Sequence, residues 1–139
     1  MPTLTRLYVK TSLAYLVAAL WLALVMALAQ ATTLSRLLTA VGPVYFHLFL
    51  VGWVTQLIMG IVFWMFPKYS RERPRGSERL AYATYGLLNA GLLLRAVGEP
   101  MRTVSPAALW GWLLVASALL QWLAGAGFVA NTWGRVKER

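Results

Sequence analysis

The chain has 139 residues, of which 60% are hydrophobic and 12% are charged, whereas about a quarter of the residues in soluble domains are charged. A net charge of +9 can indicate nucleic-acid binding, but the basic residues lie between long apolar runs and are not mixed with aromatic residues on one face. The chain has no cysteine, which excludes disulfides, thiolate metal sites, iron–sulfur clusters and thioether-linked haem. These features predict a single-domain, all-α integral membrane protein over residues 1–139, with no nucleic-acid partner.

Four apolar stretches are long enough to cross a bilayer as helices, at about residues 12–31, 44–67, 80–97 and 107–133. A hydrocarbon layer about 30 Å thick requires about 20 such residues, because each residue of a helix rises ~1.5 Å. Short connections that contain proline and glycine separate the stretches. We therefore expect a membrane four-helix bundle.

The first stretch has a competing interpretation, because it ends in Ala27-Leu28-Ala29, which resembles a signal-peptidase site. The apolar run is longer than the roughly 7–15 residues typical of a signal peptide. We therefore interpret it as a membrane span.

The distribution of basic residues predicts the orientation, because short loops rich in Lys and Arg stay on the cytoplasmic side. With four spans, the amino-terminal tail, the middle loop and the carboxy-terminal tail share one side, and together they carry ten of the thirteen basic residues. The opposite side carries Arg36 and Arg102, and Arg95 lies near the outer end of the third stretch. This asymmetry predicts a multi-pass protein of the cell inner membrane with both termini in the cytoplasm.

The predicted spans contain no Asp, Glu or Lys. Proton-coupled transporters usually need a carboxylate inside the membrane, so a transporter is a minor hypothesis. The single histidine has no nucleophile or base in a recognisable motif, and no hydrolytic site is expected. Two ionisable residues remain in the outer third of the apolar layer, His47 and Arg95, and such residues usually mark function.

A neutral imidazole on a helix with apolar and aromatic neighbours, as at His47, is a suitable axial ligand of haem iron. The alternative is an interfacial histidine that only hydrogen-bonds a loop carbonyl.

The segment from His47 to Pro67 favours the first interpretation. It reads HLFLVGWVTQLIMGIVFWMFP and resembles the second helix of the haem-copper oxidase catalytic subunit, a superfamily that includes the nitric oxide reductases. In that family this helix enters from the outer side, carries a haem-ligating histidine near its outer end and leaves through an aromatic and proline-containing inner end. The matching positions are His47 and Trp64-Met65-Phe66-Pro67.

The resemblance implies that the chain is similar to one four-helix unit of that subunit. It implies a small membrane haem b protein, with His47 as the iron ligand, for electron transfer or for binding a diatomic gas such as O2 or NO. The chain lacks the copper-site histidines and the cross-linked Tyr–His pair of the family, so it is not expected to be a stand-alone oxidase.

Three arginines on the predicted outer side are candidates to pair with the haem propionates, which point outward in this family. Arg95 is the preferred partner, followed by Arg102 and then Arg36. Arg95 has an equal alternative, in which it extends to lipid headgroups or pairs with Glu99 four residues further on.

One histidine per chain bears on the stoichiometry. A haem with two histidine ligands would require two chains, which predicts a homo-oligomer with haem near a subunit interface. Five-coordinate haem, or Met101 as second ligand, would allow one haem per chain. The main rival function is a non-catalytic membrane subunit or assembly factor without a cofactor.

Small and polar residues at helical spacing predict the packing faces. They are Gly52, Gln56 and Gly60 in the second stretch, Gly86 and Asn89 in the third, and Ser117, Gln121 and Gly125 in the fourth. We expect Gln56 and Gln121 to hydrogen-bond across helices, because neither amide is tolerated facing lipid.

Overall fold

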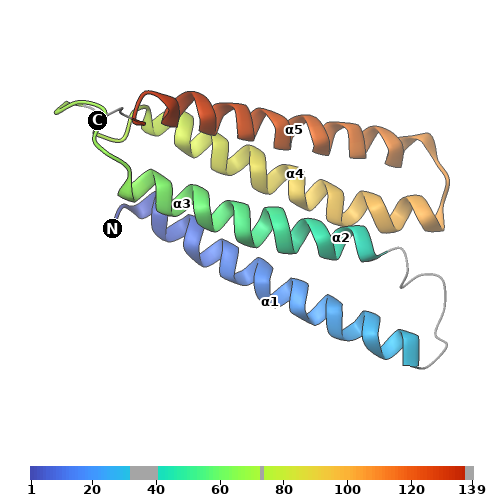
Figure 1. The fold of residues 1–139 in the computed structure, drawn as a ribbon. Coiled ribbons are helices and arrows are strands. Elements are labelled where there is room, and N and C mark those ends of the chain that lie inside the picture. Colours follow the sequence, from blue (N-terminus) through green and yellow to red (C-terminus); the bar gives the residue numbers. More distant parts are fainter. Residues whose placement is uncertain (32–40, 73, 137–139) are drawn as a thin grey trace.

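The computed structural model describes residues 1–31, 41–72 and 74–136, most of which are helical. The helices are α1 (Thr3–Ala31), α2 (Gly42–His47), the π-helical η2 (Leu48–Thr55), α3 (Gln56–Met65), α4 (Glu78–Val104) and α5 (Ala108–Trp133). α2, η2 and α3 follow one another without a break and form one rod (Figure 1). The described chain is therefore all-α, with four rods long and apolar enough to cross a membrane, as the sequence predicts.

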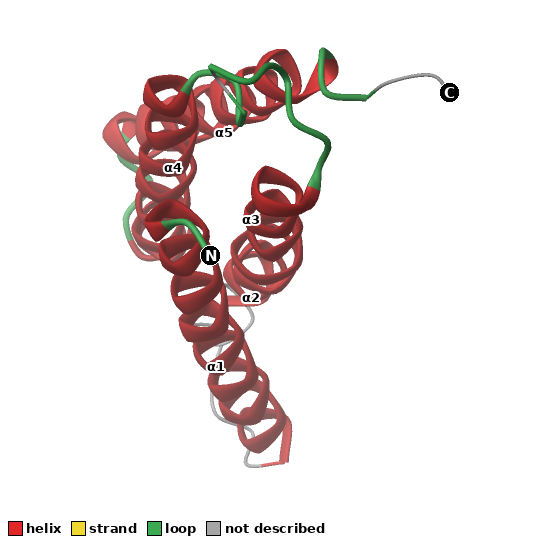
Figure 2. Cartoon of the chain, turned by 90° about the vertical axis from the view of Figure 1, so that its left-hand side faces the viewer, coloured by secondary structure: helices red, strands yellow, loops and turns green. Residues whose placement is uncertain are grey.

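The start of α1 and the end of α5 lie at the same end of the bundle, here called the terminal end (Figure 1). The opposite end is called the distal end. α5 packs on α4, while α1 packs on η2 and α3. Figure 2, which looks at the terminal end, shows these two layers with α4 beside α1. α4 joins the layers, because it also contacts α1, α2 and η2.

Three helices, α1, α2 and α4, begin earlier than their apolar stretches do, and α4 begins only two residues early, at Glu78. α1 begins at Thr3, so its first turns include Arg6 and Lys10, and long basic side chains can extend from an apolar helix toward water. α2 begins at Gly42 with Pro43 in its first turn, where the missing N–H of proline costs no intrahelical hydrogen bond.

The third helix differs most from the expectation, because α4 continues to Val104 although Gly98 and Pro100 predict an end near residue 97. Membrane helices tolerate proline where neighbouring elements stabilise the backbone around it. Gly98 lets α5 approach closely, since a Cβ atom at that position would lie 3.1 Å from Leu114 Cδ2. The extra turns place Glu99 inside a helix and not in a loop.

The glycines at the α1 interface confirm one predicted packing face. A Cβ atom on Gly60 would lie 2.6 Å from Tyr8 Cβ, and one on Gly52 would lie 2.8 Å from Tyr15 Cγ. The other two predicted glycine contacts are wrong, because Gly86 and Gly125 have no atom within 4 Å of an added Cβ. α1 and the second rod therefore meet at Gly52 and Gly60. α4 and α5 do not meet at Gly86 or Gly125, but they approach closely at Gly98.

Arg135, just after α5, connects the ends of two rods. Its guanidinium donates to the carbonyls of Phe63, Phe66 and Pro67 at 3.2, 2.8 and 3.0 Å, and the residue is almost fully buried. The carbonyls at the end of a helix lack intrahelical donors, and a cation is favoured there. Burial lowers the pKa of Arg135, and Arg75 lowers it further, yet a guanidinium stays charged at neutral pH.

Gly60→Ala should destabilise the bundle by about 1–3 kcal/mol, because the new methyl group overlaps the rigid Cβ of Tyr8. Gly125→Ala is the matched control, since its added methyl meets no atom and alanine is the better helix former. Thermal unfolding in detergent, followed by circular dichroism, measures the difference. Equal midpoints for both variants would contradict the close contact.

Arg135→Ala should lower stability by about 2 kcal/mol, because three carbonyls lose charged donors. Arg71→Ala removes the same charge from an exposed position and serves as the control. Unfolding in detergent compares the two variants, and Arg135 has no capping role if they unfold at the same temperature.

Candidate functional site

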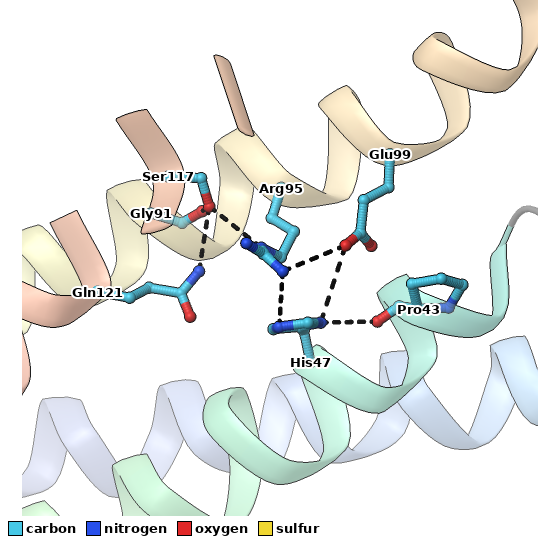
Figure 3. Close-up of polar contacts among 7 residues, drawn as sticks. All are labelled: Pro43, His47, Gly91, Arg95, Glu99, Ser117 and Gln121. Carbon is cyan, nitrogen blue, oxygen red and sulfur yellow. Dashed lines mark hydrogen bonds and ion pairs between the residues drawn. The ribbon is translucent and has the colours of Figure 1, made fainter. Parts of the chain in front are cut away.

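His47 is the last residue of α2, and its ring is held by its own helix. Nδ1 lies 2.9 Å from the carbonyl oxygen of Pro43, four residues earlier. Because a carbonyl can only accept, the hydrogen-bond network assigns the ring proton to Nδ1. A neutral ring in this tautomer has its lone pair on Nε2, on the side that faces α4 (Figure 3).

Arg95 of α4 reaches across to this nitrogen. Its Nη1 lies 2.8 Å from His47 Nε2 and 3.4 Å from Glu99 Oε1, one turn further along α4. Its Nε lies 3.4 Å from Ser117 Oγ of α5. One guanidinium therefore connects three rods at the distal half of the bundle (Figure 3).

Ser117 positions the guanidinium from the α5 side. Its hydroxyl is fully buried, donates to the Gly91 carbonyl at 2.6 Å, and accepts from Gln121 Nε2 at 3.1 Å. Gly91 permits this contact, because a Cβ atom there would lie 2.8 Å from Gln121 Cγ. The α4–α5 contact at Gly91 thus places a hydroxyl beside Arg95.

The charges of this cluster balance when His47 is neutral. The side chains of His47, Arg95 and Glu99 are 23%, 19% and 12% exposed, so all three are largely withdrawn from solvent. Arg95 and Glu99 form an ion pair, and Glu99 Oε1 also lies 3.9 Å from His47 Nδ1. A neutral imidazole that accepts from a paired arginine adds no net charge to an apolar region.

The structure brings two of the predicted site residues together and places a third apart from them. His47 and Arg95 lie in direct contact, and the alternative pairing of Arg95 with Glu99 is present. Arg102 is exposed on α4, and no hydrogen bond or ion pair joins it to His47 within residues 41–72 and 74–136. Arg36 lies outside the described residues.

The expectation that the spans contain no carboxylate is wrong, because α4 extends past residue 97 and includes Glu99. The i, i+4 spacing of Arg95 and Glu99 predicts their pairing, but the glycine and proline around Glu99 predict that the helix ends before it. The case against a transporter rested on the absence of carboxylates from the predicted spans, and Glu99 within α4 weakens it.

The predicted bonds of the two glutamines across helices are also wrong. Gln121 donates to Ser117 within α5, so only the serine completes the link to α4. Gln56 is fully buried, and neither of its amide atoms has a hydrogen-bond partner among the described residues.

The π-helical η2 begins directly after His47, and the sequence reasoning missed it. A π-helix has wider turns than an α-helix, is rare, and often occurs at functional sites. Thr55 at its end donates from Oγ1 to the Leu50 carbonyl five residues earlier, at 2.9 Å. No simple sequence signal marks such a stretch.

Comparison with known proteins adds no assignment. No protein-family model matches the chain, and neither a curated protein nor a solved structure matches it.

Arg95→Met should destabilise the protein by about 2–3 kcal/mol, because it leaves the Glu99 carboxylate buried without its cation. The double variant Arg95→Met/Glu99→Met should recover most of that loss, because no unpaired charge remains. Arg102→Met is the control, since that arginine is exposed on the same helix. Unfolding midpoints of wild type, Arg95→Met, Glu99→Met and the double variant form the cycle, and additive losses would show that the ion pair is uncoupled.

Proposed function

We propose that this chain is a small membrane haem b protein in which His47 Nε2 is an axial ligand of the iron. The observation that carries the proposal is the hydrogen bond from Nδ1 to the Pro43 carbonyl at 2.9 Å. Histidines that ligate metals typically donate their other ring N–H to a carbonyl or carboxylate, which fixes the tautomer and the ring orientation. The resemblance of the segment His47–Pro67 to a haem-binding helix supports the same assignment.

The side chains around His47 fit the donor chemistry of such a site. Nε2 is the nitrogen with the lone pair, and its present donor is Arg95 Nη1 at 2.8 Å. Iron binding requires the arginine to turn away from Nε2. Its long side chain can then pair with an anionic propionate, for which a guanidinium is well suited. Bound haem would supply one-electron chemistry or an open position for O2 or NO.

The proposal includes a placement in the membrane. The basic residues favour four spans of the cell inner membrane with the terminal end in the cytoplasm, which puts His47 and Arg95 in the outer half. Each chain has one histidine, so a bis-histidine haem joins two chains and makes the protein a homo-oligomer. Five-coordinate haem needs only one chain and leaves a site for a gas.

A second candidate is a non-catalytic membrane subunit or assembly factor, and one observation favours it. Both ring nitrogens of His47 already have partners, Pro43 and Arg95, so the ring can act as a latch between α2 and α4. In this case the histidine is structural, and the protein needs no cofactor.

Absorption spectra of the detergent-purified protein with added haem separate the two functions. We expect a Soret band that His47→Gly removes and that added imidazole restores, because imidazole can replace the missing ligand. Arg102→Met should keep the band. If the wild-type protein shows no Soret band after haem addition, or if His47→Gly binds haem as well as wild type, His47 is not the ligand.

The haem content decides the stoichiometry. A pyridine haemochrome assay combined with the native mass should give one haem per two chains for bis-histidine ligation, and one per chain for the five-coordinate form. The second candidate instead predicts a colourless protein in which His47→Gly mainly lowers the unfolding temperature.

A further inference from the structure

A second polar region lies in the terminal half of the bundle, away from the His47 cluster. It consists of buried or partly buried hydroxyl and amide side chains between α1, α3 and α4. Those with a hydrogen bond are Tyr8, Thr11, Tyr15, Tyr85 and Asn89, and those without one are Thr5, Gln56 and Thr84. These eight residues are here called the polar column.

Part of the column is satisfied by contacts between α1 and α4. The hydroxyls of Thr11 and Tyr85 lie 2.7 Å apart, and Tyr15 donates to Asn89 Oδ1 at 3.0 Å. The Asn89 amide also donates to the Tyr85 carbonyl at 2.8 Å. These bonds align α1 with α4 along two helical turns.

The rest of the column has no protein partner within the described ranges. Gln56 and Thr5 are 0% exposed and Thr84 is 2% exposed, yet Thr5 Oγ1, Thr84 Oγ1 and both amide atoms of Gln56 have no hydrogen bond. An amide buried in apolar surroundings without hydrogen bonds is strongly destabilising. Native proteins satisfy such groups with ordered water.

The glycine contacts locate Gln56. Gly52 and Gly60 lie four residues before and after Gln56, and they pack against Tyr15 and Tyr8 of α1. Gln56 therefore faces α1 between these two tyrosines, at the level of Ser12. Ser12 is fully buried and donates to its own helix at Val9, so its oxygen can still accept.

Thr84 lies on the opposite side of Tyr8, in a small cavity. Tyr8, Thr84, Asn131 and Thr132 supply its polar lining, and Phe63 and Phe128 are among its apolar residues. The cavity has room for about one water molecule, and it has the two or more polar partners that a bound water needs. Asn131 and Thr132 belong to the last turn of α5, so the cavity lies near the terminal end.

An apolar layer closes the column on the distal side. Ala19, Leu48 and Leu92 are all buried there, each less than a tenth exposed. Asn89 and Arg95 are six residues apart on α4, which is about 9 Å along the helix axis. The column therefore ends below the His47 cluster and does not join it.

We propose that the polar column binds internal water at two places, at the Gln56 amide between α1 and α3 and in the cavity beside Thr84, which has room for about one molecule. The water supplies the hydrogen bonds that the protein groups lack. It enters from the terminal end and stops at the apolar layer. This site is independent of the haem proposal, because none of its residues contacts His47 in the described structure.

Water-edited solid-state NMR of the protein in lipid bilayers tests this directly. The chain has three glutamines, so selective 15N-Gln labelling gives three side-chain amides, and Gln56→Met identifies the signal of Gln56. Gln30 is exposed at the end of α1 and is the wet reference. We expect water to transfer magnetisation to the Gln56 amide at a rate comparable to that of Gln30. No transfer to Gln56 at mixing times that saturate Gln30 would overturn the proposal.

The sign of a stability change gives a second test. If water completes the hydrogen bonds of Gln56, Gln56→Met should lower the unfolding midpoint by a few degrees, because it breaks a satisfied network. Thr84→Val should act in the same direction. Thr55→Val is the control, since that exposed hydroxyl bonds its own helix. A higher midpoint for Gln56→Met would show that the amide is dry and unsatisfied.

Discussion

The Arg95 guanidinium holds the distal half of this bundle together. α4 and α5 form one layer, and α1 and the rod of α2, η2 and α3 form the other. Arg95 reaches His47 in one layer and Ser117 in the other rod of its own layer. In apolar surroundings these bonds have no competing water, so losing one of them leaves a buried donor or acceptor unpaired. Glu99 and Ser117 contact this cation directly, and Gly91 lets Ser117 and Gln121 pack closely enough against α4 to hold Ser117 in place.

The same constraint gives His47 two compatible roles. As a latch, the ring accepts from Arg95 and donates to Pro43, and every polar atom of the ring is satisfied. As an iron ligand, it keeps the bond to Pro43 and exchanges its bond with Arg95 for one to the metal. The exchange is favourable only if the freed guanidinium remains paired with an anion. That anion is either Glu99, its present partner, or a haem propionate. The latch therefore stays closed under the cofactor-free proposal and opens upon haem binding under the other.

The two halves of the bundle handle polar groups differently. The distal half concentrates charge in one ion pair and one imidazole, packed against buried apolar residues such as Leu48 and Leu92. Apart from Arg135 at its end, the terminal half uses neutral hydroxyls and amides, some bonded between α1 and α4 and some left for water. Neutral groups are less costly to bury than charges, so they can be spread over several turns. The apolar layer between the halves keeps the charged cluster apart from the water proposed below it.

The sequence alone determined the number of rods and singled out His47 and Arg95, which lie in contact in the structure. Hydrophobic length and the rarity of ionisable residues in apolar segments are local properties, and they can be read without knowing the fold. Only the tertiary structure decided that α4 continues through Pro100, that Glu99 and Ser117 contact Arg95, and that Gln56 lacks a protein partner. These facts depend on which helices are neighbours and on how closely glycines such as Gly91 and Gly98 let them approach. Helix periodicity shows which residues share a face, but the partner of that face is chosen by packing among all the rods at once.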